Sequence, residues 1–188
     1  MGKNFNMDTI KVLMILADGF EEIEVAAPLD ILRRAGAYVT LAALTGTEAT
    51  GAHGICYKAD CSLADVYDKD FDLLILPGGG GGTAKLAASE KVLTLIRRYK
   101  NENRRIAAIC AAPTVLAKAE VINCVNLTSY PGTEDAFDAK YYSTEKVVTD
   151  GLFTTSRGPG TAIDFALELV ELLYGMAKKE EVREQIVY

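Results

Sequence analysis

The chain has 188 residues, of which 49% are hydrophobic, and a formal net charge of −6. This length and composition suit one domain with a full hydrophobic core, and the acidic balance, without a large Lys/Arg cluster, excludes a nucleic-acid partner. No apolar run approaches the ~18 residues needed to cross a membrane, and the first residues lack the apolar segment of a secretory signal. Residues 1–8 are expected to form a short flexible tail and residues 9–188 the domain.

The four cysteines do not form a recognisable metal or disulfide pattern. There is no CxxC pair, and no cysteine has ligand spacing with the only histidine, His53; the cysteines are Cys56, Cys61, Cys110 and Cys124. This usage predicts a reducing, cytoplasmic location, with no structural metal and no disulfide scaffold.

The first half of the chain alternates strands and helices. In chain order, the pattern predicts a strand at residues 10–16, a helix at 21–34, a strand at 38–44, a short edge strand at 55–57, a helical turn at 62–67 and a strand at 71–76. The first strand, IKVLMIL, is apolar enough to be central in a sheet. Gly36 ends the first helix, because glycine readily adopts the left-handed backbone that closes a helix.

Five consecutive glycines, residues 78–82, follow the strand at 71–76. Such a run indicates backbone that approaches another segment closely and presents its amides, although a simply flexible loop is the alternative. It matches neither a phosphate-binding P-loop, because no Gly-Lys-Ser/Thr follows, nor a dinucleotide fingerprint, because it comes third rather than first.

The second half continues the same alternation. It predicts a helix capped by Ser89, a strand at 106–109, a helix at 111–118, a short strand at 125–128, a hairpin of strands 146–149 and 152–155, and helices at 162–174 and 178–185. The Asp-Gly pair at 150–151 is a strong hairpin signal. The whole order predicts an α/β fold: a flavodoxin-like, doubly wound, mostly parallel sheet with helices on both faces, in a single domain.

Cys110 stands where a buried strand meets a helix. Ala108 and Ala112, two residues to either side, are small, as in a nucleophile elbow, where a sharp turn leaves no room for larger neighbours. A helix N-terminus also favours a thiolate by stabilising negative charge. The alternative is an inert buried thiol, as most lone cysteines are.

Three strand ends should meet at one edge of the sheet. The loops at Glu24, at Gly78 and Gly79, and at Cys110 each follow a predicted parallel strand, and open α/β sheets place their functional sites at that edge. This convergence favours a reactive Cys110. The acids at residues 21–24 also have an ordinary explanation, because carboxylates are favourable at the start of a helix.

Five motifs of the sequence, taken together, resemble a known family. The matching motifs are residues 17–24 (ADGFEEIE), 32–36 (LRRAG), 76–79 (LPGG), 107–114 (AAICAAPT) and 155–161 (TSRGPGT). In this order they resemble the DJ-one/ThiJ/PfpI superfamily, whose fold is like that of class I glutamine amidotransferases, and most closely its DJ-one (DJ-1) branch, that of the Parkinson-disease protein deglycase. The resemblance covers the chain from Ile10 onward.

The resemblance implies the site residues. It assigns Cys110 as the reactive cysteine, Glu24 as the adjacent carboxylic acid, and the amides of Gly79 and Ala111 as the lining of an oxyanion pocket. Gly78, Tyr130, His53, Arg157 and Pro159 are expected to border that pocket. It also implies a homodimer.

Two departures separate this chain from many relatives. A histidine that lies near the cysteine in many of them is replaced here by Tyr130, and the protease-like branch typically has histidine where this chain has Ala111. In the DJ-one branch an arginine often approaches the pocket across the dimer near the position of His53, so His53 is a candidate for that role. Without a histidine base, a cysteine peptidase or amidotransferase-like hydrolase is disfavoured.

The resemblance implies a glutathione-independent glyoxalase or deglycase. A Cys110 thiolate would add to an α-oxoaldehyde such as methylglyoxal, and Glu24, its pKa raised by burial and by the neighbouring thiolate, would shuttle the proton. No cofactor or metal is required. The alternative is an oxidative-stress sensor or chaperone that acts through oxidation of Cys110 to the sulfinate.

Overall fold

A computed structural model describes residues 9–188; the tail expected at residues 1–8 lies outside the described residues. Its strands are β1 (Lys11–Leu16), β2 (Tyr38–Ala43), β3 (Glu48–Thr50), β4 (Cys56–Lys58), β5 (Cys61–Ser62), β6 (Leu73–Leu76), β7 (Arg105–Ile109), β8 (Val147–Asp150) and β9 (Phe153–Ser156). Its α-helices are α1 (Glu22–Ala35), α2 (Leu63–Val66), α3 (Gly80–Ala88), α4 (Glu90–Asn101), α5 (Pro113–Lys118), α6 (Ala162–Tyr174) and α7 (Met176–Gln185). Two 3₁₀ turns, η1 (Glu134–Ala136) and η2 (Pro159–Thr161), complete the elements.

The main sheet has the order β5-β2-β1-β6-β7-β9-β8. Its strands are parallel except β8, which runs antiparallel to β9. If the five longer parallel strands are numbered along the chain, their spatial order is 2-1-3-4-5, the flavodoxin-like order. The predicted doubly wound, mostly parallel sheet is therefore confirmed, and the switch in strand order lies between β1 and β6.

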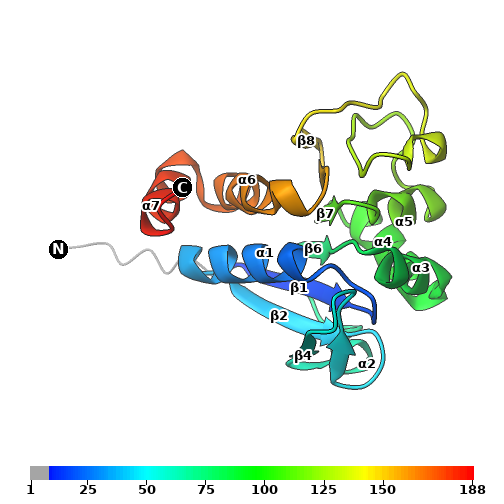
Figure 1. The fold of residues 1–188 in the computed structure, drawn as a ribbon, viewed down its shortest axis with the longest axis horizontal. Coiled ribbons are helices and arrows are strands. Elements are labelled where there is room, and N and C mark those ends of the chain that lie inside the picture. Colours follow the sequence, from blue (N-terminus) through cyan, green and yellow to red (C-terminus); the bar gives the residue numbers. More distant parts are fainter. Residues whose placement is uncertain (1–8) are drawn as a thin grey trace.

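Helices cover both faces of this sheet. On one face α1 and α6 lie side by side and α7 packs at their end, as Figure 1 shows. On the other face α2, α3, α4 and α5 bury their apolar residues against the sheet. No helix in residues 9–188 is long and apolar enough to cross a membrane.

The central strand β1 explains the two cores. Its residues from Val12 to Leu16 are all buried, so the strand has no solvent-facing side, as expected for a parallel strand covered by helices on both faces. Val12 and Met14 belong to the core beneath α1 and α6, whereas Leu13 and Ile15 belong to the opposite core. The alternation follows the two-residue period of a strand.

Three local predictions differ from the structure. The glycine run is not a loop throughout, because α3 begins at Gly80; the backbone hydrogen bonds of a helix form there despite the low helix propensity of glycine. The expected strand at 125–128 is reduced to a single bridge between Leu127 and Tyr142. The helix expected from residue 111 begins only at Pro113.

The edge strand expected at 55–57 is β4, which pairs with β3 in a separate two-stranded sheet.

Candidate active site

Cys110 lies directly after β7 in a strained backbone conformation. Its φ is 65°, in the left-handed region that residues with a side chain rarely adopt. Two hydrogen bonds hold the residue there: its N–H donates to the carbonyl of Ser156 at 2.9 Å, and its carbonyl accepts from the N–H of Tyr130 at 2.8 Å. The sharp turn expected at Cys110 is therefore present, and the backbone of two other segments maintains it.

Gly78, Glu24 and Cys110 meet at the carboxyl edge of the sheet. The N–H of Gly78 donates a 2.8 Å hydrogen bond to Oε2 of Glu24. A Cβ at residue 78 would lie 2.6 Å from the Cβ of Cys110 and 2.6 Å from Oε2 of Glu24. The loops after β6 and β7 and the first turn of α1 thus converge, as the strand order requires.

Glu24 is a buried carboxyl group. It is 0% exposed, although it lies in the first turn of α1. Its Oε1 is buried and has no well-formed hydrogen bond within residues 9–188. Burial raises the pKa of Glu24 to about 7, opposed by its interactions with the Cys110 thiol and the Gly78 N–H and reinforced by the charge of Glu21. The group can therefore hold or release a proton near neutral pH.

Cys110 is likewise buried, with 7% of the residue exposed. Burial, followed by the charge of Glu24, raises its pKa to about 12, while the N–H groups of Gly79 and Ala111 act in the opposite direction. α5 begins only at Pro113, so the N–H groups beside the sulfur come from Gly79 and Ala111, and while Glu24 is ionised its charge opposes the expected thiolate.

Repulsion between their two negative charges makes Glu24 and Cys110 one acid–base pair. A proton on Glu24 removes the repulsion that raises the pKa of Cys110, so a neutral carboxyl group favours the thiolate and an ionised one favours the thiol. The N–H groups of Gly79 and Ala111 are directed at the sulfur and stabilise its negative charge. The pair therefore holds one proton that can sit on either partner.

The structure places Tyr130 and Arg157 around this pair through the backbone. Tyr130 is half exposed, with its N–H bonded to Cys110 and its ring next to Gly158, where a Cβ would lie 3.1 Å from Cδ2. Arg157 follows Ser156, and its Nη1 is buried with no hydrogen-bond partner in the described part of the chain. Pro159 begins η2 directly after this turn. Tyr130 and Ser156, which precedes Arg157, are thus joined to Cys110 by backbone hydrogen bonds.

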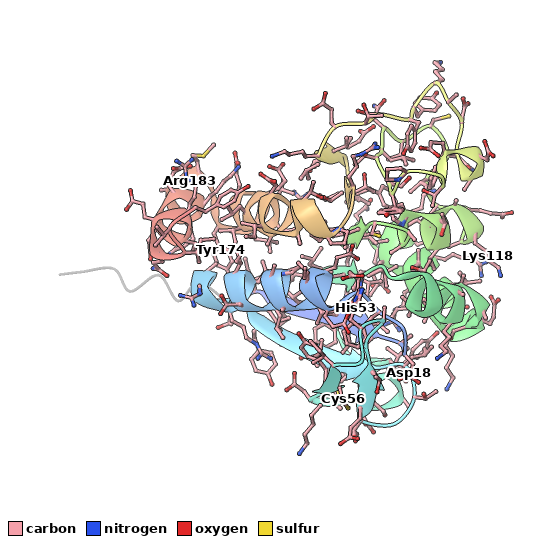
Figure 2. The ribbon with its side chains drawn as sticks, in the orientation of Figure 1. Asp18, His53, Cys56, Lys118, Tyr174 and Arg183 are labelled. Atoms are coloured by element: carbon pink, nitrogen blue, oxygen red, sulfur yellow. The ribbon has the colours of Figure 1, made fainter. Side chains whose placement is uncertain are left out.

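His53 is hydrogen-bonded to Glu22 at the start of α1. Its Nδ1 is 2.9 Å from Oε2 of Glu22, and its N–H donates to Oε1 of Glu22 at 2.8 Å. Figure 2 labels His53 beside the first turn of α1. The imidazole is 68% exposed. Within the described residues its ring is bonded to Glu22, two residues before Glu24.

These features agree with the comparisons to known proteins. The family model of the DJ-1/PfpI family matches residues 10–172. The chain belongs to the DJ-1/PfpI family. It is 46% identical over 173 residues to Protein dj-1beta of Drosophila melanogaster, and the match covers 90% of this chain and 92% of that protein.

Two further relatives bear on the DJ-1 branch. The chain is 33% identical to Deglycase PH1704 of Pyrococcus horikoshii, over 87% of this chain and 99% of that protein. Among solved structures, oxidized Toxoplasma gondii DJ-1 superposes with a TM-score of 0.93 at 33% identity, covering 96% of this chain and 99% of that one. The resemblance to the DJ-1 branch is thereby confirmed.

Sequence reasoning missed one residue of this DJ-1/PfpI region, Glu22. Its carboxylate accepts hydrogen bonds from the N–H groups of His53 and Ile55 and so fastens the loop before β4 to α1. The acids at residues 21–24 were visible, but a favourable interaction with the helix start explained them equally well. The partner lies 31 positions away, and no local pattern joins the two.

Proposed function

We propose that this protein is a glutathione-independent glyoxalase or deglycase that acts on methylglyoxal-type α-oxoaldehydes or their adducts. The observation that carries the proposal is the buried Glu24 carboxyl group, with a pKa of about 7, packed beside the strained Cys110. The deglycase name of the archaeal relative supports the same chemistry. The expected family roles, Cys110 as nucleophile and Glu24 as proton shuttle, are part of this proposal.

The reaction begins with the proton on Glu24 and the charge on Cys110. The thiolate adds to the aldehyde carbon of methylglyoxal, and the aldehyde oxygen takes the proton from Glu24 to give a hemithioacetal. Glu24, now ionised, removes the proton from the former aldehyde carbon, which forms an enediolate, and returns it to the neighbouring carbon, while the hydroxyl proton passes from the former aldehyde oxygen to the neighbouring oxygen. The resulting thioester of a hydroxy acid is hydrolysed by water, which releases lactate and restores the thiol.

The backbone around Cys110 supports this sequence. The N–H groups of Gly79 and Ala111 stabilise the sulfur before attack and are proposed to stabilise the oxygen that gains charge afterwards. Gly78, Tyr130, Arg157 and Pro159 are proposed to border the substrate, with Tyr130 orienting it. The mechanism uses no cofactor. We also propose a reducing, cytoplasmic location, which fits the four free cysteines.

We further propose that the protein is a homodimer. Ile23 of α1 and Ile55 before β4 are 54% and 55% exposed, so large apolar side chains face solvent on neighbouring segments. Sedimentation velocity at micromolar concentration tests this, and a purely monomeric protein would contradict it.

A second candidate function is oxidative-stress sensing through Cys110. The strained backbone and the amides directed at the sulfur would also hold the oxygens of a sulfinate, and a relative has been solved in an oxidized form. A cysteine peptidase is disfavoured because Tyr130 stands where many relatives have a histidine and His53 is bonded to Glu22.

The deciding experiment incubates the purified protein with methylglyoxal, without glutathione, and measures lactate. The parent should produce lactate and Cys110→Ser should not. Cys124→Ser is the matched control, because Cys124 is an exposed thiol with a similarly positive φ of 62°. Equal lactate from parent and Cys110→Ser would refute the enzymatic proposal.

A further inference from the structure

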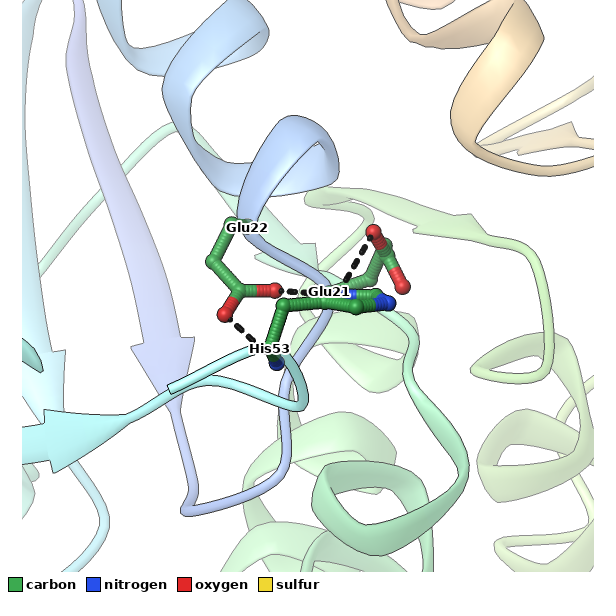
Figure 3. A group of neighbouring side chains, drawn as sticks. All are labelled: Glu21, Glu22 and His53. Carbon is green, nitrogen blue, oxygen red and sulfur yellow. Dashed lines mark hydrogen bonds and ion pairs between the residues drawn. The ribbon is translucent and has the colours of Figure 1, made fainter. Parts of the chain in front are cut away.

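A second group of ionisable side chains lies beside the proposed active site. Glu21 and Glu22 stand at the start of α1, and His53, in the loop before β4, faces both of them, as Figure 3 shows. The Nδ1 of His53 is 2.9 Å from Oε2 of Glu22 and 3.6 Å from Oε1 of Glu21. One potential ligand atom from each residue lies within 4.8 Å of the others. The mechanism proposed above uses none of these three side chains.

The backbone holds Glu22 in place within this group. Its side chain is only 7% exposed, and its Oε1 accepts the N–H groups of His53 and Ile55. Gly51 faces the same carboxylate, and any side chain there would collide with it. Oε1 is therefore fully engaged, whereas Oε2 is directed at the imidazole.

The three potential ligand atoms lie close enough together to surround one ion. A tetrahedral zinc ion with ligand distances of about 2.0–2.2 Å holds its ligand atoms roughly 3.3–3.6 Å apart. Of the two separations from Nδ1, 3.6 Å to Glu21 lies at the upper end of that range and 2.9 Å to Glu22 is shorter than it. A small rotation of the exposed imidazole would admit the ion, which would replace the proton that Nδ1 shares with Oε2 of Glu22.

We propose that Glu21, Glu22 and His53 form a binding site for a divalent transition-metal ion of the zinc class. One imidazole nitrogen and two carboxylate oxygens suit zinc, since calcium and magnesium prefer oxygen ligands alone and copper(I) prefers sulfur. In the single chain described the imidazole is 68% exposed, which leaves room for a water in the fourth position. The sequence predicted no metal site, because His53 is 31 positions from Glu22 and 32 from Glu21. This inference does not depend on the proposed function.

Calorimetric titration of the full-length protein with zinc chloride tests the site. The parent should bind one ion, and His53→Ala and Glu21→Gln should each weaken binding by at least ~10-fold, since even residues that only support a ligand contribute about 10- to 100-fold. Cys110→Ser should bind zinc as the parent does, which separates this site from the proposed nucleophile. Glu145→Gln, at an exposed glutamate outside the cluster, controls for the loss of one negative charge.

Two further measurements keep the test decisive. His53→Gln retains a hydrogen-bonding side chain for Glu22 but lacks the imidazole, so it should also lose binding if circular dichroism shows a native fold. Cobalt(II) bound to the parent should lack the charge-transfer band of a thiolate ligand. Zinc binding that survives in both His53 variants, that disappears in Cys110→Ser, or that is absent from the parent would overturn the proposal.

Discussion

The N–H of Gly78 donates a 2.8 Å hydrogen bond to the buried carboxyl group of Glu24, 54 positions away in the chain. The same glycine has no space for a side chain, because a Cβ would lie 2.6 Å from the Cβ of Cys110 and 2.8 Å from the carbonyl oxygen of Ile109. Gly78 therefore has two roles. Its N–H orients the carboxyl group of Glu24, and its lack of a side chain leaves the space in which Glu24 and Cys110 lie close together.

Gly78→Ala should damage the site and the fold together. The added methyl group must push Cys110 or Glu24 away, and overpacking of this kind costs about 1–3 kcal/mol in the free energy of unfolding. A displacement of the reacting groups should also lower lactate production by on the order of 10²-fold. Chemical denaturation and the lactate assay measure the two effects.

Gly80→Ala is the matched control for that change. A Cβ at Gly80, the first residue of α3, meets no atom within 4 Å. This variant should be as stable as the parent, or up to about 1 kcal/mol more stable, because alanine favours a helix over glycine. If both variants lose activity equally, the close contact at Gly78 is not the cause.

The pKa of Glu24 predicts a specific pH dependence of stability. It rises from 4.5 to about 7 on folding, so the folded state binds more protons than the unfolded state between these values. The free energy of unfolding should therefore fall as the pH rises from about 4.5 to 7, by roughly 3 kcal/mol from this group alone. Glu24→Gln, which carries no charge, should lack this loss.

Urea denaturation of the parent and Glu24→Gln at pH 5 and pH 8 checks this prediction. The two proteins should be similar at pH 5, and the variant should be the more stable one at pH 8. A constant difference at both pH values would show that Glu24 does not titrate in this window.

The sequence predicted the sheet well because strands and helices leave local periodic patterns. The run from residue 10 to 16 reads as a central strand, and β1 is buried along nearly its whole length. The Asp-Gly pair at 150–151 predicted the hairpin of β8 and β9. Helix α3 (Gly80–Ala88) was missed, because glycines signal a loop locally. Here they allow close packing instead: a Cβ at Gly82 would lie 2.9 Å from the backbone of Phe20.

The candidate site was predictable only where one segment carried the signal. Small neighbours marked the sharp turn at Cys110, and its φ of 65° agrees with them. The raised pKa of the thiol was not predictable, because it depends on burial and on Glu24, which approaches from α1. The bonding of His53 to Glu22 likewise arises only when the loop before β4 folds onto that helix.

Tyr130→Phe should leave most of the lactate production intact. Tyr130 is held near Cys110 by its backbone N–H, a bond that the substitution keeps, and its side chain is half exposed. If the phenol only orients the substrate, its loss should raise KM more than it lowers kcat. A fall in kcat as deep as that of Cys110→Ser would show that Glu24 is not the only proton shuttle.

Glu24→Gln separates the enzyme from the sensor. The amide keeps a hydrogen-bonding group beside the sulfur but cannot exchange a proton, so turnover should fall by ~10²–10⁴-fold, the usual effect of losing a general acid–base group. The variant also removes the carboxylate charge that raises the pKa of Cys110, while the N–H groups of Gly79 and Ala111 still stabilise the thiolate. Peroxide should therefore oxidise Cys110 at least as readily as in the parent.

Two measurements on the same samples follow these opposite effects. Lactate release reports catalysis, and mass spectrometry of peroxide-treated protein reports oxidation of Cys110. Lost lactate with retained oxidation supports Glu24 as the proton shuttle, because the thiol remains reactive when only proton transfer is removed. Lactate production equal to that of the parent would contradict the mechanism, since a glutamine cannot carry the proton between the two carbons and another group would then have to be the shuttle.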